Sequence, residues 1–515
     1  MRIGIDVGGT NTDAVLMDGS QIVGSCKVPT TKNVTDGIAD SICTLFQQTS
    51  AAPQSVESTV IGTTHFINSL VEANNLAGTA VIRLGLPATA GIPPLAGWPE
   101  RLTTAMQART FLCQGGHEID GRPISKVVPS EIREAAEIAA QQGISSFALS
   151  SVYSPVSNDA ELEARRTILE VLPNARVTMS HEVGRIGLLE RENATAINAA
   201  MADLATSICA GLQDAVSSAG VVAPLFLSQN DGTLMTVARA ADFPVLTFAS
   251  GPTNSMRGAA FLSGLQECAV VDVGGTTSDF GIIHNGFPRE ASTAVDVSGV
   301  RTNFRMPDVI AIGIGGGSVV TDDGQVGPSS VGYELTRKGL VFGGATRTSS
   351  DIATASGLTS LGDPSLVKHI SKELSTRAFA YIRTQMGDAL DRLRTDSQPL
   401  PLVAVGGGSF LVPDDIPGVS MMARPSHSGV ANAIGAATAQ VGGEIDKMYS
   451  IAPGTRDSVI DNAKNEAVER AVSAGADPKS VRIVEVDEVP LAYLPGNATR
   501  VRIKAVGDTM VGTQR

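Results

Sequence analysis

An α/β protein of two related halves, followed by a small α/β appendage, is the fold class that this sequence predicts. Short apolar runs typical of strands alternate with amphipathic stretches typical of helices. A glycine-rich motif flanked by such runs occurs near the N-terminus and again in the middle of the chain. With 515 residues, the chain is also too long to fold around a single core.

The repeated motif is a glycine-rich hairpin. It reads DVGGTNTD over residues 6–13 and DVGGTTSD over residues 272–279. Apolar runs lie on both sides of each copy, so each copy is expected to form a strand, a tight turn and a second strand. Glycines let a ligand approach backbone N–H groups, and threonines add hydroxyl donors, which suits phosphate. A single copy is equally consistent with an ordinary turn, but the near-identical pair predicts two halves that hold a nucleotide between them.

The hairpins supply the first candidate site residues. We expect the turns to bind phosphate through Gly8, Gly9, Thr10 and Asn11 in one copy and through Gly274, Gly275, Thr276 and Thr277 in the other. A carboxylate beside such a turn cannot hold phosphate itself. Asp6 and Asp272 can instead hold Mg²⁺ through water or orient an attacking oxygen.

The rest of the N-terminal half, residues 1–186, is predicted to be one α/β domain. Its expected helices cover residues 34–48, 66–73, 130–142 and 159–171. Its expected further strands cover residues 60–61, 79–84, 145–151 and 177–180.

A second α/β domain is predicted for residues 187–445, because an alanine-rich helical stretch around residues 187–220 marks a change in composition. Beyond the second hairpin, its strands are expected at residues 225–228, 232–236, 245–248 and 402–405, and its helices at 255–262 and 365–394. The loop at residues 452–454 sets apart the appendage, residues 446–515. There we expect a charged helix at 457–474 and strands at 481–486 and 499–505.

Four further loops resemble the hairpin turns in chemistry. Residues 62–64 and 250–253 each follow an expected strand and precede a helix, where N–H groups point at an anion, although a plain strand-to-helix turn is as consistent. Consecutive glycines cost conformational entropy and therefore predict ligand contact at Gly315, Gly316 and Gly317 and at Gly406, Gly407 and Gly408. The second of these loops follows a strand and suits a nucleoside. The small-residue helix at residues 429–437 is predicted to pack closely against another helix.

Composition and missing motifs argue against several classes of function. A net charge of −13 and an aromatic content of 4% argue against nucleic-acid binding. The five scattered cysteines never form a CxxC pair, which fits reduced thiols in a cytoplasmic protein and argues against cysteine-bound zinc. No P-loop occurs. His65 and His181 are possible site residues, but ordinary structural roles are favoured. We expect no signal peptide and no membrane span.

These motifs together resemble the superfamily of actin, hexokinase and heat-shock chaperone ATPases. Within it, the chain is similar to the hydantoinase/oxoprolinase A-type subunits, which are related to the acetone carboxylase β subunit. The resemblance runs from Met1 to about Gly442. It rests on IGIDVGGTNTD, GTTHFINSL, ERENATAINA, FASGPTNS, VVDVGGTTSDFGII and IGIGGGS, in that order.

The resemblance implies two actin-like (ribonuclease H-like) domains with Mg²⁺ and ATP in the cleft between them. It also implies an ATP-dependent hydrolase of cyclic amide C–N bonds. In that activity, the γ-phosphate passes to the carbonyl oxygen of a cyclic amide or imide, such as a hydantoin or oxoproline, and prepares the ring for opening. A second, B-type polypeptide is the implied partner.

The resemblance also assigns roles to residues. The two turns would hold phosphates, and Asp6 and Asp272 would position Mg²⁺ and the attacking oxygen. Asp13 and Asp279 would brace the loops or reach the metal through water. The glycines at 406–408 would face the nucleoside. The phosphate or substrate side would be lined by Thr63, Thr64 and Asn68.

The sequence departs from the family pattern in three places, and two alternative functions stay open. The usual SGPAGG loop reads SGPTNS over residues 250–255, the proline- and glycine-rich stretch becomes YELTRK over residues 333–338, and only a short appendage follows Gly443. One alternative is a small-molecule or sugar kinase of the same superfamily, although that group does not normally repeat DVGGTTSD. The other is an ATP-driven assembly or reactivation factor.

Overall fold

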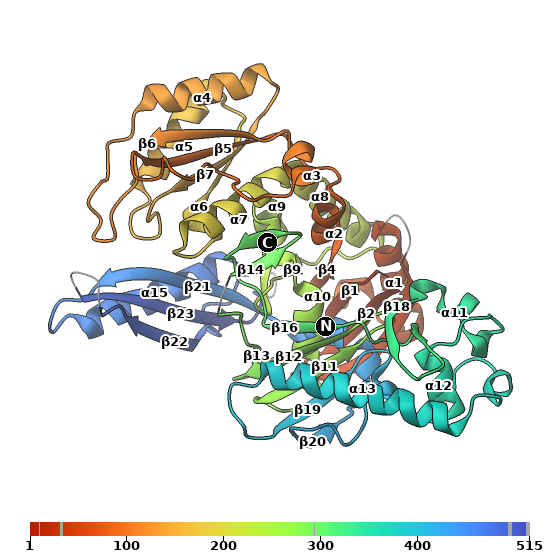
Figure 1. Ribbon diagram of the computed structural model, residues 1–515. Coiled ribbons are helices and arrows are strands. Elements are labelled where there is room, and N and C mark those ends of the chain that lie inside the picture. Colours follow the sequence, from red (N-terminus) through yellow and green to blue (C-terminus); the bar gives the residue numbers. More distant parts are fainter. Residues whose placement is uncertain (10, 31–33, 293, 493–496, 511–515) are drawn as a thin grey trace.

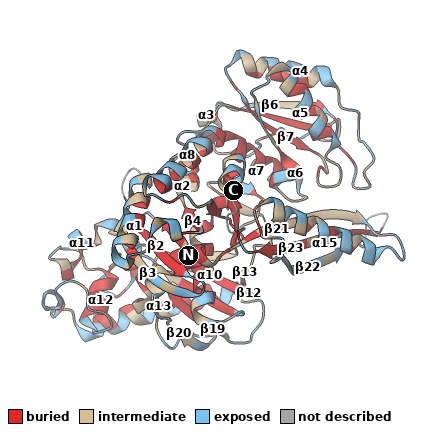
Figure 2. Cartoon of the chain, turned by 180° about the vertical axis from the view of Figure 1, so that it is seen from behind, coloured by how far each residue is buried: buried red, intermediate tan, exposed pale blue. Residues whose placement is uncertain are grey.

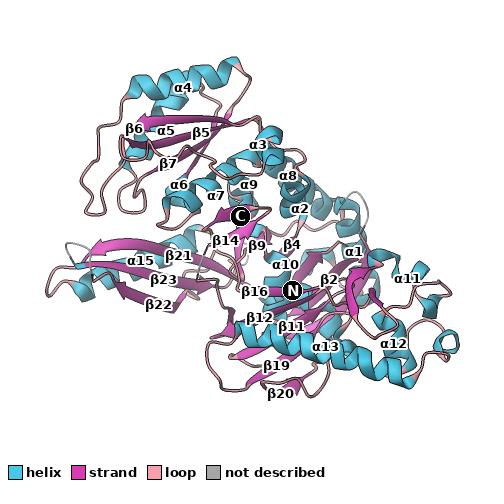
Figure 3. Cartoon of the chain, in the orientation of Figure 1, coloured by secondary structure: helices cyan, strands magenta, loops and turns pink. Residues whose placement is uncertain are grey.

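The computed structural model describes residues 1–9, 11–30, 34–292, 294–492 and 497–510. In this part of the chain the strands form one nine-stranded, one six-stranded and one four-stranded sheet, together with two small hairpin ribbons (Figure 1). Helices cover the sheets, as Figure 3 shows in the same orientation. The strands at the centre of each sheet are buried, whereas the outer helices expose one face (Figure 2).

The nine-stranded sheet contains the first glycine-rich hairpin. Its order is β22–β23–β21–β10–β9–β4–β1–β2–β3. In that order the strands span Arg482–Pro490, Ala498–Gly507, Gln440–Ser450, Thr233–Thr236, Leu225–Ser228, Ser58–Thr63, Arg2–Val7, Asn11–Asp18 and Gln21–Pro29. β1 pairs antiparallel with β2 and parallel with β4. Strands from both predicted halves and from the C-terminal region therefore lie in one sheet.

The six-stranded sheet repeats this arrangement around the second hairpin. Its main path is β13–β12–β11–β19–β20, and β16 pairs with β12. In that order the strands span Phe287–Pro288, Ser278–His284, Cys268–Val273, Leu400–Val405 and Val419–Ala423, with β16 at Val309–Ile312. β11 pairs antiparallel with β12 and parallel with β19, as β1 does with β2 and β4. The duplication predicted from the two motifs thus extends to strand order.

The four-stranded sheet is entirely parallel and separate from the two hairpins. Its order is β6–β5–β7–β8, from Arg109–Gln114, Thr79–Leu86, Ser146–Ser151 and Arg176–Met179. Helices α4 (Pro129–Gln141) and α5 (Asp159–Val171) pack against each other on one face. Helix α7 (Leu188–Ala200) packs against the same sheet and continues toward the nine-stranded sheet (Figure 1).

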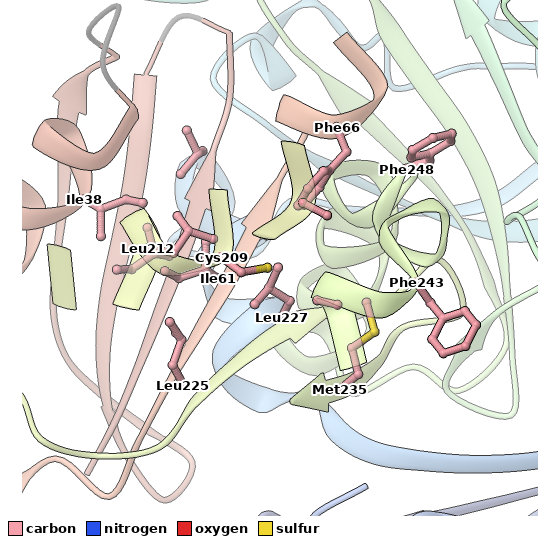
Figure 4. Close-up of a cluster of buried hydrophobic side chains, with 14 of the residues drawn as sticks. Ile38, Ile61, Phe66, Cys209, Leu212, Leu225, Leu227, Met235, Phe243 and Phe248 are labelled. Atoms are coloured by element: carbon pink, nitrogen blue, oxygen red, sulfur yellow. The ribbon is translucent and has the colours of Figure 1, made fainter. Parts of the chain in front are cut away.

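The largest core lies beside the nine-stranded sheet and is shown in Figure 4. Helix α1 (Val34–Thr49) buries Ile38, Ile42 and Leu45, whose spacing places them on one helical face. Helix α8 (Ala202–Ser218) contributes Cys209 and Leu212 to the same core. This core fixes the sheet from which the first hairpin projects.

Most expected elements are present, but one strand prediction is wrong. Residues 245–248, predicted as a strand, lie in the 3₁₀ turn η2 (Pro244–Thr247) and the residue after it. Pro244 restricts the backbone at the start of this turn. The side chain of Asn230 then donates to the Val245 carbonyl at 2.9 Å, so no neighbouring strand is needed to satisfy that oxygen. The turn leads directly into helix α10 (Ser250–Ser263).

The C-terminal region has the predicted helix and two strands, but its strands lengthen the first sheet. Helix α15 (Arg456–Ser473) packs on β21 and β23. The predicted domain limits at 186/187 and 445/446 stay predictions, and strands pair across both of them. Among the described residues no single helix has the length and apolar character of a membrane span; the bent pair α7 and α8 meets both criteria only when taken together.

Candidate nucleotide-binding site

The two glycine turns have matching backbone geometry. The Gly8 N–H donates to the Asn11 carbonyl at 3.0 Å, and the Gly274 N–H donates to the Thr277 carbonyl at 2.9 Å. A Cβ atom at Gly9, or at the equivalent residue of the second turn, would meet no atom of the described residues within 4 Å. The second turn is exposed throughout, and Thr10 of the first turn lies outside the described residues. Both tips therefore leave room for a ligand against the backbone.

Two pairs of aspartates stand at the bases of these turns. Asp6 lies opposite Asp13, and Asp272 lies opposite Asp279, at the same register positions of the two hairpins. Directly opposed residues project to the same face of a sheet, so each hairpin presents a pair of carboxylates.

The carboxylates of the two hairpins interact electrostatically. Burial is the main cause that raises the pKa of Asp6 to about 7, and the charges of Asp13 and Asp272 raise it further. Burial likewise raises the pKa of Asp272, with a contribution from Asp13. The pKa of Asp279 rises to about 7 through burial and then through the charge of Asp272. The acidic groups of both halves thus form one unit that repels itself when ionised.

Three polar side chains on two helices hold these carboxylates. From α10, Asn254 donates its amide to Asp6 at 3.1 Å and Ser255 donates its hydroxyl to Asp272 at 2.5 Å. From α14 (Ala431–Thr438), Asn432 donates to Asp6 at 3.1 Å and to Asp13 at 3.0 Å. The sequence reasoning did not identify these residues. A polar residue inside a helix of small residues, such as Asn432, is the signal that could have found one of them.

Close packing of α10 against α14 fixes the three donors. A Cβ at Gly258 of α10 would overlap the carbonyl of Ala431, and a Cβ at Gly435 of α14 would overlap the carbonyl of Asn254. The prediction that residues 429–437 pack closely against another helix is confirmed. α10 also contacts β1 and β4 of one sheet and β11, β12 and β19 of the other, so it lies between the two hairpins (Figure 1).

The loop at residues 406–408 lies against the second hairpin. Gly406 has a positive φ of 87°, and a Cβ there would overlap the carboxylate of Asp272. The Gly408 N–H donates to the Val273 carbonyl at 2.8 Å. Gly407 is exposed, and a Cβ at this position would meet nothing within 4 Å. The loop is therefore positioned beside Asp272, and its contact with a nucleoside stays a prediction.

The glycines at residues 315–317 brace the second turn. The Gly316 N–H donates to the Gly274 carbonyl at 2.9 Å, and the Gly317 N–H donates to the Gly275 carbonyl at 2.7 Å. A Cβ at Gly315 would lie 2.6 Å from the Thr276 nitrogen. Two of the three N–H groups are thus already used by the turn. Direct phosphate contact by this loop stays a prediction that the hydrogen bonding does not favour.

Thr63, Thr64 and Asn68 lie beside the first hairpin at the end of β4 and in α2 (His65–Glu72). Thr63 is buried, and the Ser250 hydroxyl accepts from its N–H at 3.2 Å and donates to its carbonyl at 3.1 Å. Asn68 is exposed and donates to Thr64 at 3.5 Å. This segment therefore links the first hairpin to the start of α10, and a substrate contact there stays a prediction.

Lys27 is a further candidate site residue, which the sequence pattern did not indicate. It lies on β3 opposite Asp13, forms an ion pair with it and is 42% exposed. Its charge also lowers the pKa of Asp272, against the effect of burial. His181, by contrast, is held by the buried Glu161 at 2.5 Å in the four-stranded domain, which supports a structural role.

The donor set fits a hydrated divalent cation next to phosphates. Oxygen ligands are those that Mg²⁺ prefers, and the ion commonly keeps several waters. Asp6 and Asp272 offer carboxylate oxygens whose mutual repulsion a cation would relieve. The buried Asn254 Oδ1 has no hydrogen-bond partner among the described residues, so it is available to a water or an ion.

A second acidic cluster does not fit a metal ion as well. Oxygen atoms of Asp231, Glu290 and Glu444 lie within 4.8 Å of one another. However, Arg502 contacts Glu290 at 2.6 Å and Glu444 at 3.0 Å, and Lys504 contacts Asp231 at 2.9 Å. These cations already neutralise the carboxylates, so the cluster is an ion-pair network that joins the C-terminal strands to the rest of the molecule.

The architecture and the paired hairpins define an α/β protein of the duplicated actin-like class. The family described as "Hydantoinase/oxoprolinase N-terminal region" matches residues 2–172, and "Hydantoinase/oxoprolinase" matches residues 191–358. The chain belongs to the hydantoinase/oxoprolinase family, as its motifs predicted.

Curated relatives and solved structures agree with this assignment. The chain is 25% identical over 413 residues to the caprolactamase subunit alpha of Pseudomonas jessenii, covering 76% of this chain and 59% of that protein. It is 25% identical over 374 residues to the acetophenone carboxylase gamma subunit of Aromatoleum aromaticum, and the match covers 64% of this chain and 49% of that protein. The chain therefore spans about half to three fifths of the length of these relatives.

The solved structures confirm the predicted fold class. The ATP-dependent caprolactamase of Pseudomonas jessenii has a TM-score of 0.79 at 18% identity, over 98% of this chain and 87% of that one. Nucleotide-free acetone carboxylase has a TM-score of 0.67 at 16% identity, and the match covers 99% of this chain and 88% of that chain.

Proposed function

We propose that this chain is the ATP-binding subunit of an ATP-dependent hydrolase that activates the carbonyl of a cyclic amide or imide for ring opening. The observation that carries the proposal is that adjacent residues of α10 bind Asp6 of one hairpin and Asp272 of the other, so the aspartates of both hairpins meet beneath two open glycine turns. Membership of the hydantoinase/oxoprolinase family and the name of the caprolactamase relative support the amide class.

The residues of this chain would divide the work as follows. The two turns would bind phosphate oxygens through backbone N–H groups at their tips, such as those of Gly9 and Gly275, because the N–H groups of Gly8 and Gly274 already donate within the turns. Asp6 and Asp272 would hold Mg²⁺ through water and orient the attacking carbonyl oxygen, while Lys27 would offset negative charge beside Asp13. Mg-ATP, when bound, supplies the phosphoryl group that makes the amide carbonyl a better electrophile. Asp13 and Asp279 would keep both hairpins aligned.

A B-type partner subunit and a cytoplasmic location belong to the same proposal. Two curated relatives are named as subunits, and this chain spans only part of the length of each. We therefore propose that ring opening requires a second polypeptide, while nucleotide binding is a property of this chain.

The test is phosphate release from Mg-ATP, measured with a panel of cyclic amides, imides and ketones. The chain is assayed alone and after co-purification with its native partners. Stimulation by a cyclic amide or imide, together with the ring-opened acid as product, supports the proposal. A stable phosphorylated product would indicate the kinase alternative, and stimulation by a protein partner alone would indicate the assembly factor. Absence of Mg-ATP binding in calorimetry would refute the nucleotide site itself.

A further inference from the structure

We propose that Asn254 and Ser255 are positioning residues, and that through them α10 acts as a rigid spacer that sets the two hairpin carboxylates, Asp6 and Asp272, in register with each other. The inference rests on the proposed nucleotide site and deepens it. It assigns a role to two side chains that stand where the family pattern has glycine.

Helical geometry explains how neighbouring residues reach opposite halves. Consecutive residues of an α-helix point in directions about 100° apart, since 3.6 residues complete a turn. Asn254 accordingly reaches Asp6 in the nine-stranded sheet at 3.1 Å, and Ser255 reaches Asp272 in the six-stranded sheet at 2.5 Å. One rigid turn of helix thus connects the two carboxylates.

Burial and hydrogen bonding prevent this turn from rotating. Asn254 is 1% exposed and Ser255 is 2% exposed. The Ser250 hydroxyl bonds both backbone groups of Thr63 on the first sheet, and the Thr253 hydroxyl donates to the Asn230 carbonyl at 3.0 Å. The start of α10 is therefore held beside the nine-stranded sheet, and Asn254 and Ser255 extend from this fixed position to the two carboxylates.

The opposite side of α10 is held by α14. A Cβ at Gly435 would overlap the backbone of Asn254, so the helices are in contact at the level of the spacer. A displacement of either hairpin would have to break a hydrogen bond of Asn254 or Ser255, because the helix between them cannot follow. The two side chains therefore convert a fixed helix position into a fixed distance between carboxylates.

Such a spacer should affect the chemical step more than nucleotide binding. The turn backbones, which make the expected phosphate contacts, do not depend on either side chain. When an interaction is needed only for alignment in the transition state, its loss lowers kcat and changes KM little. We therefore expect Ser255→Ala and Asn254→Ala each to lower kcat about tenfold or more and to leave KM for Mg-ATP within about twofold.

The experiment measures kcat and KM of ATP turnover, with kcat expressed per nucleotide site counted by calorimetry, so that unfolded protein does not enter the rate. Ser255→Thr retains the hydroxyl and should restore kcat to within about threefold of the parent. Ser263→Ala is the matched control, because this serine on the same helix bonds, within the described part of the chain, only backbone carbonyls of its own helix and the N–H of Leu265. It should leave both constants unchanged.

A double-mutant cycle separates a spacer from two independent contacts. If one spacer holds both carboxylates, loss of either hydrogen bond already removes their alignment. The kcat of the double variant Asn254→Ala/Ser255→Ala should then be only slightly lower than that of the slower single variant. Rates that fall as the product of the single effects, or an unchanged kcat in Ser255→Ala, would overturn the inference. Failure of the parent protein to bind Mg-ATP would instead overturn the proposed function. If Asn254→Ala does not fold, the comparison of Ser255→Ala with Ser255→Thr decides the matter.

Discussion

At the scale of single residues, the site is a concentration of negative charge that the protein stabilises only in part. Asp6, Asp272 and Asp279 all have raised pKa values, with burial as the largest cause. Donors from α10 and α14 favour the charged form, while the neighbouring carboxylates oppose it. Perturbed pKa values of this kind cluster at functional sites.

Substitution of Asp272 by asparagine should remove ATP turnover and leave the fold intact. The change removes the charge that would hold Mg²⁺ in the proposed function, and it leaves the side-chain volume almost unchanged. We expect kcat to fall about 100-fold or more, with a melting temperature within a few degrees of the parent. Steady-state ATPase rates and thermal unfolding check this. Asp457→Asn, at a carboxylate that is 91% exposed on α15, is the control and should change neither quantity. Parental turnover in Asp272→Asn would contradict the role of that carboxylate.

Substitution of Asp279 by asparagine should stabilise the protein at alkaline pH. The folded state raises the pKa of Asp279 to about 7 from an ordinary value of 3.8, so the folded state binds the proton more tightly than the unfolded chain does. The contribution of protonated Asp279 to the stability of the folded state is therefore fully present below about pH 4, and it is lost as the pH rises through 7. At pH 8 the variant should exceed the parent by about 2–4 kcal/mol in the free energy of unfolding, and by much less at pH 4.5. Urea unfolding of both proteins without Mg²⁺ at the two pH values measures this difference. An equal gain in the free energy of unfolding at pH 4.5 and pH 8 would contradict the prediction.

At the scale of secondary-structure elements, the hairpins could be predicted and their neighbours could not. A glycine turn between two apolar runs is a local signal, so both hairpins and the strand before Gly406 were identified. Which strand lies beside which depends on contacts between distant residues. The pairing of β4 with β9, and of β21 with β10, therefore had no signal in the sequence. Asn254 escaped notice for the same reason, since its partner Asp6 lies 248 residues away. Asn432 did have a local signal, because it is a polar residue inside a helix of small residues.

The α10–α14 contact should tolerate no added methyl group at Gly435. A Cβ there would overlap the Asn254 backbone, which has no flexible end that could move aside. We expect Gly435→Ala to lower the free energy of unfolding by about 3 kcal/mol or more. Gly429→Ala is the matched control, because a Cβ at that position meets no described residue within 4 Å. Chemical denaturation of both variants tests the contact, and equal stabilities would show that the helices are less closely packed.

At the scale of the whole molecule, the C-terminal strands complete the scaffold of the site. β21 joins β10 of the nine-stranded sheet, and β23 and β22 continue that sheet outward (Figure 1). The ion-pair network of Asp231, Glu290, Glu444, Arg502 and Lys504 then ties these strands to the segments around both hairpins. The sequence suggested an appendage because loop composition changes there, and the strands of this region pair onward from β21, so they lengthen the nine-stranded sheet.

Removal of one cation from this network should therefore weaken the whole fold. Arg502 is 13% exposed and contacts Glu290 at 2.6 Å and Glu444 at 3.0 Å, so Arg502→Met leaves two carboxylates with fewer partners in a buried setting. Breaking a buried pair in this way costs about 3–5 kcal/mol. We expect a single cooperative unfolding transition at a lower temperature, because the network links strands of both halves. Arg482→Met, on the exposed edge strand β22, is the control and should change stability by less than about 0.5 kcal/mol. If calorimetry of Arg502→Met instead showed early melting of the C-terminal region alone, with the nucleotide site intact, that region would be a separate domain attached to the core.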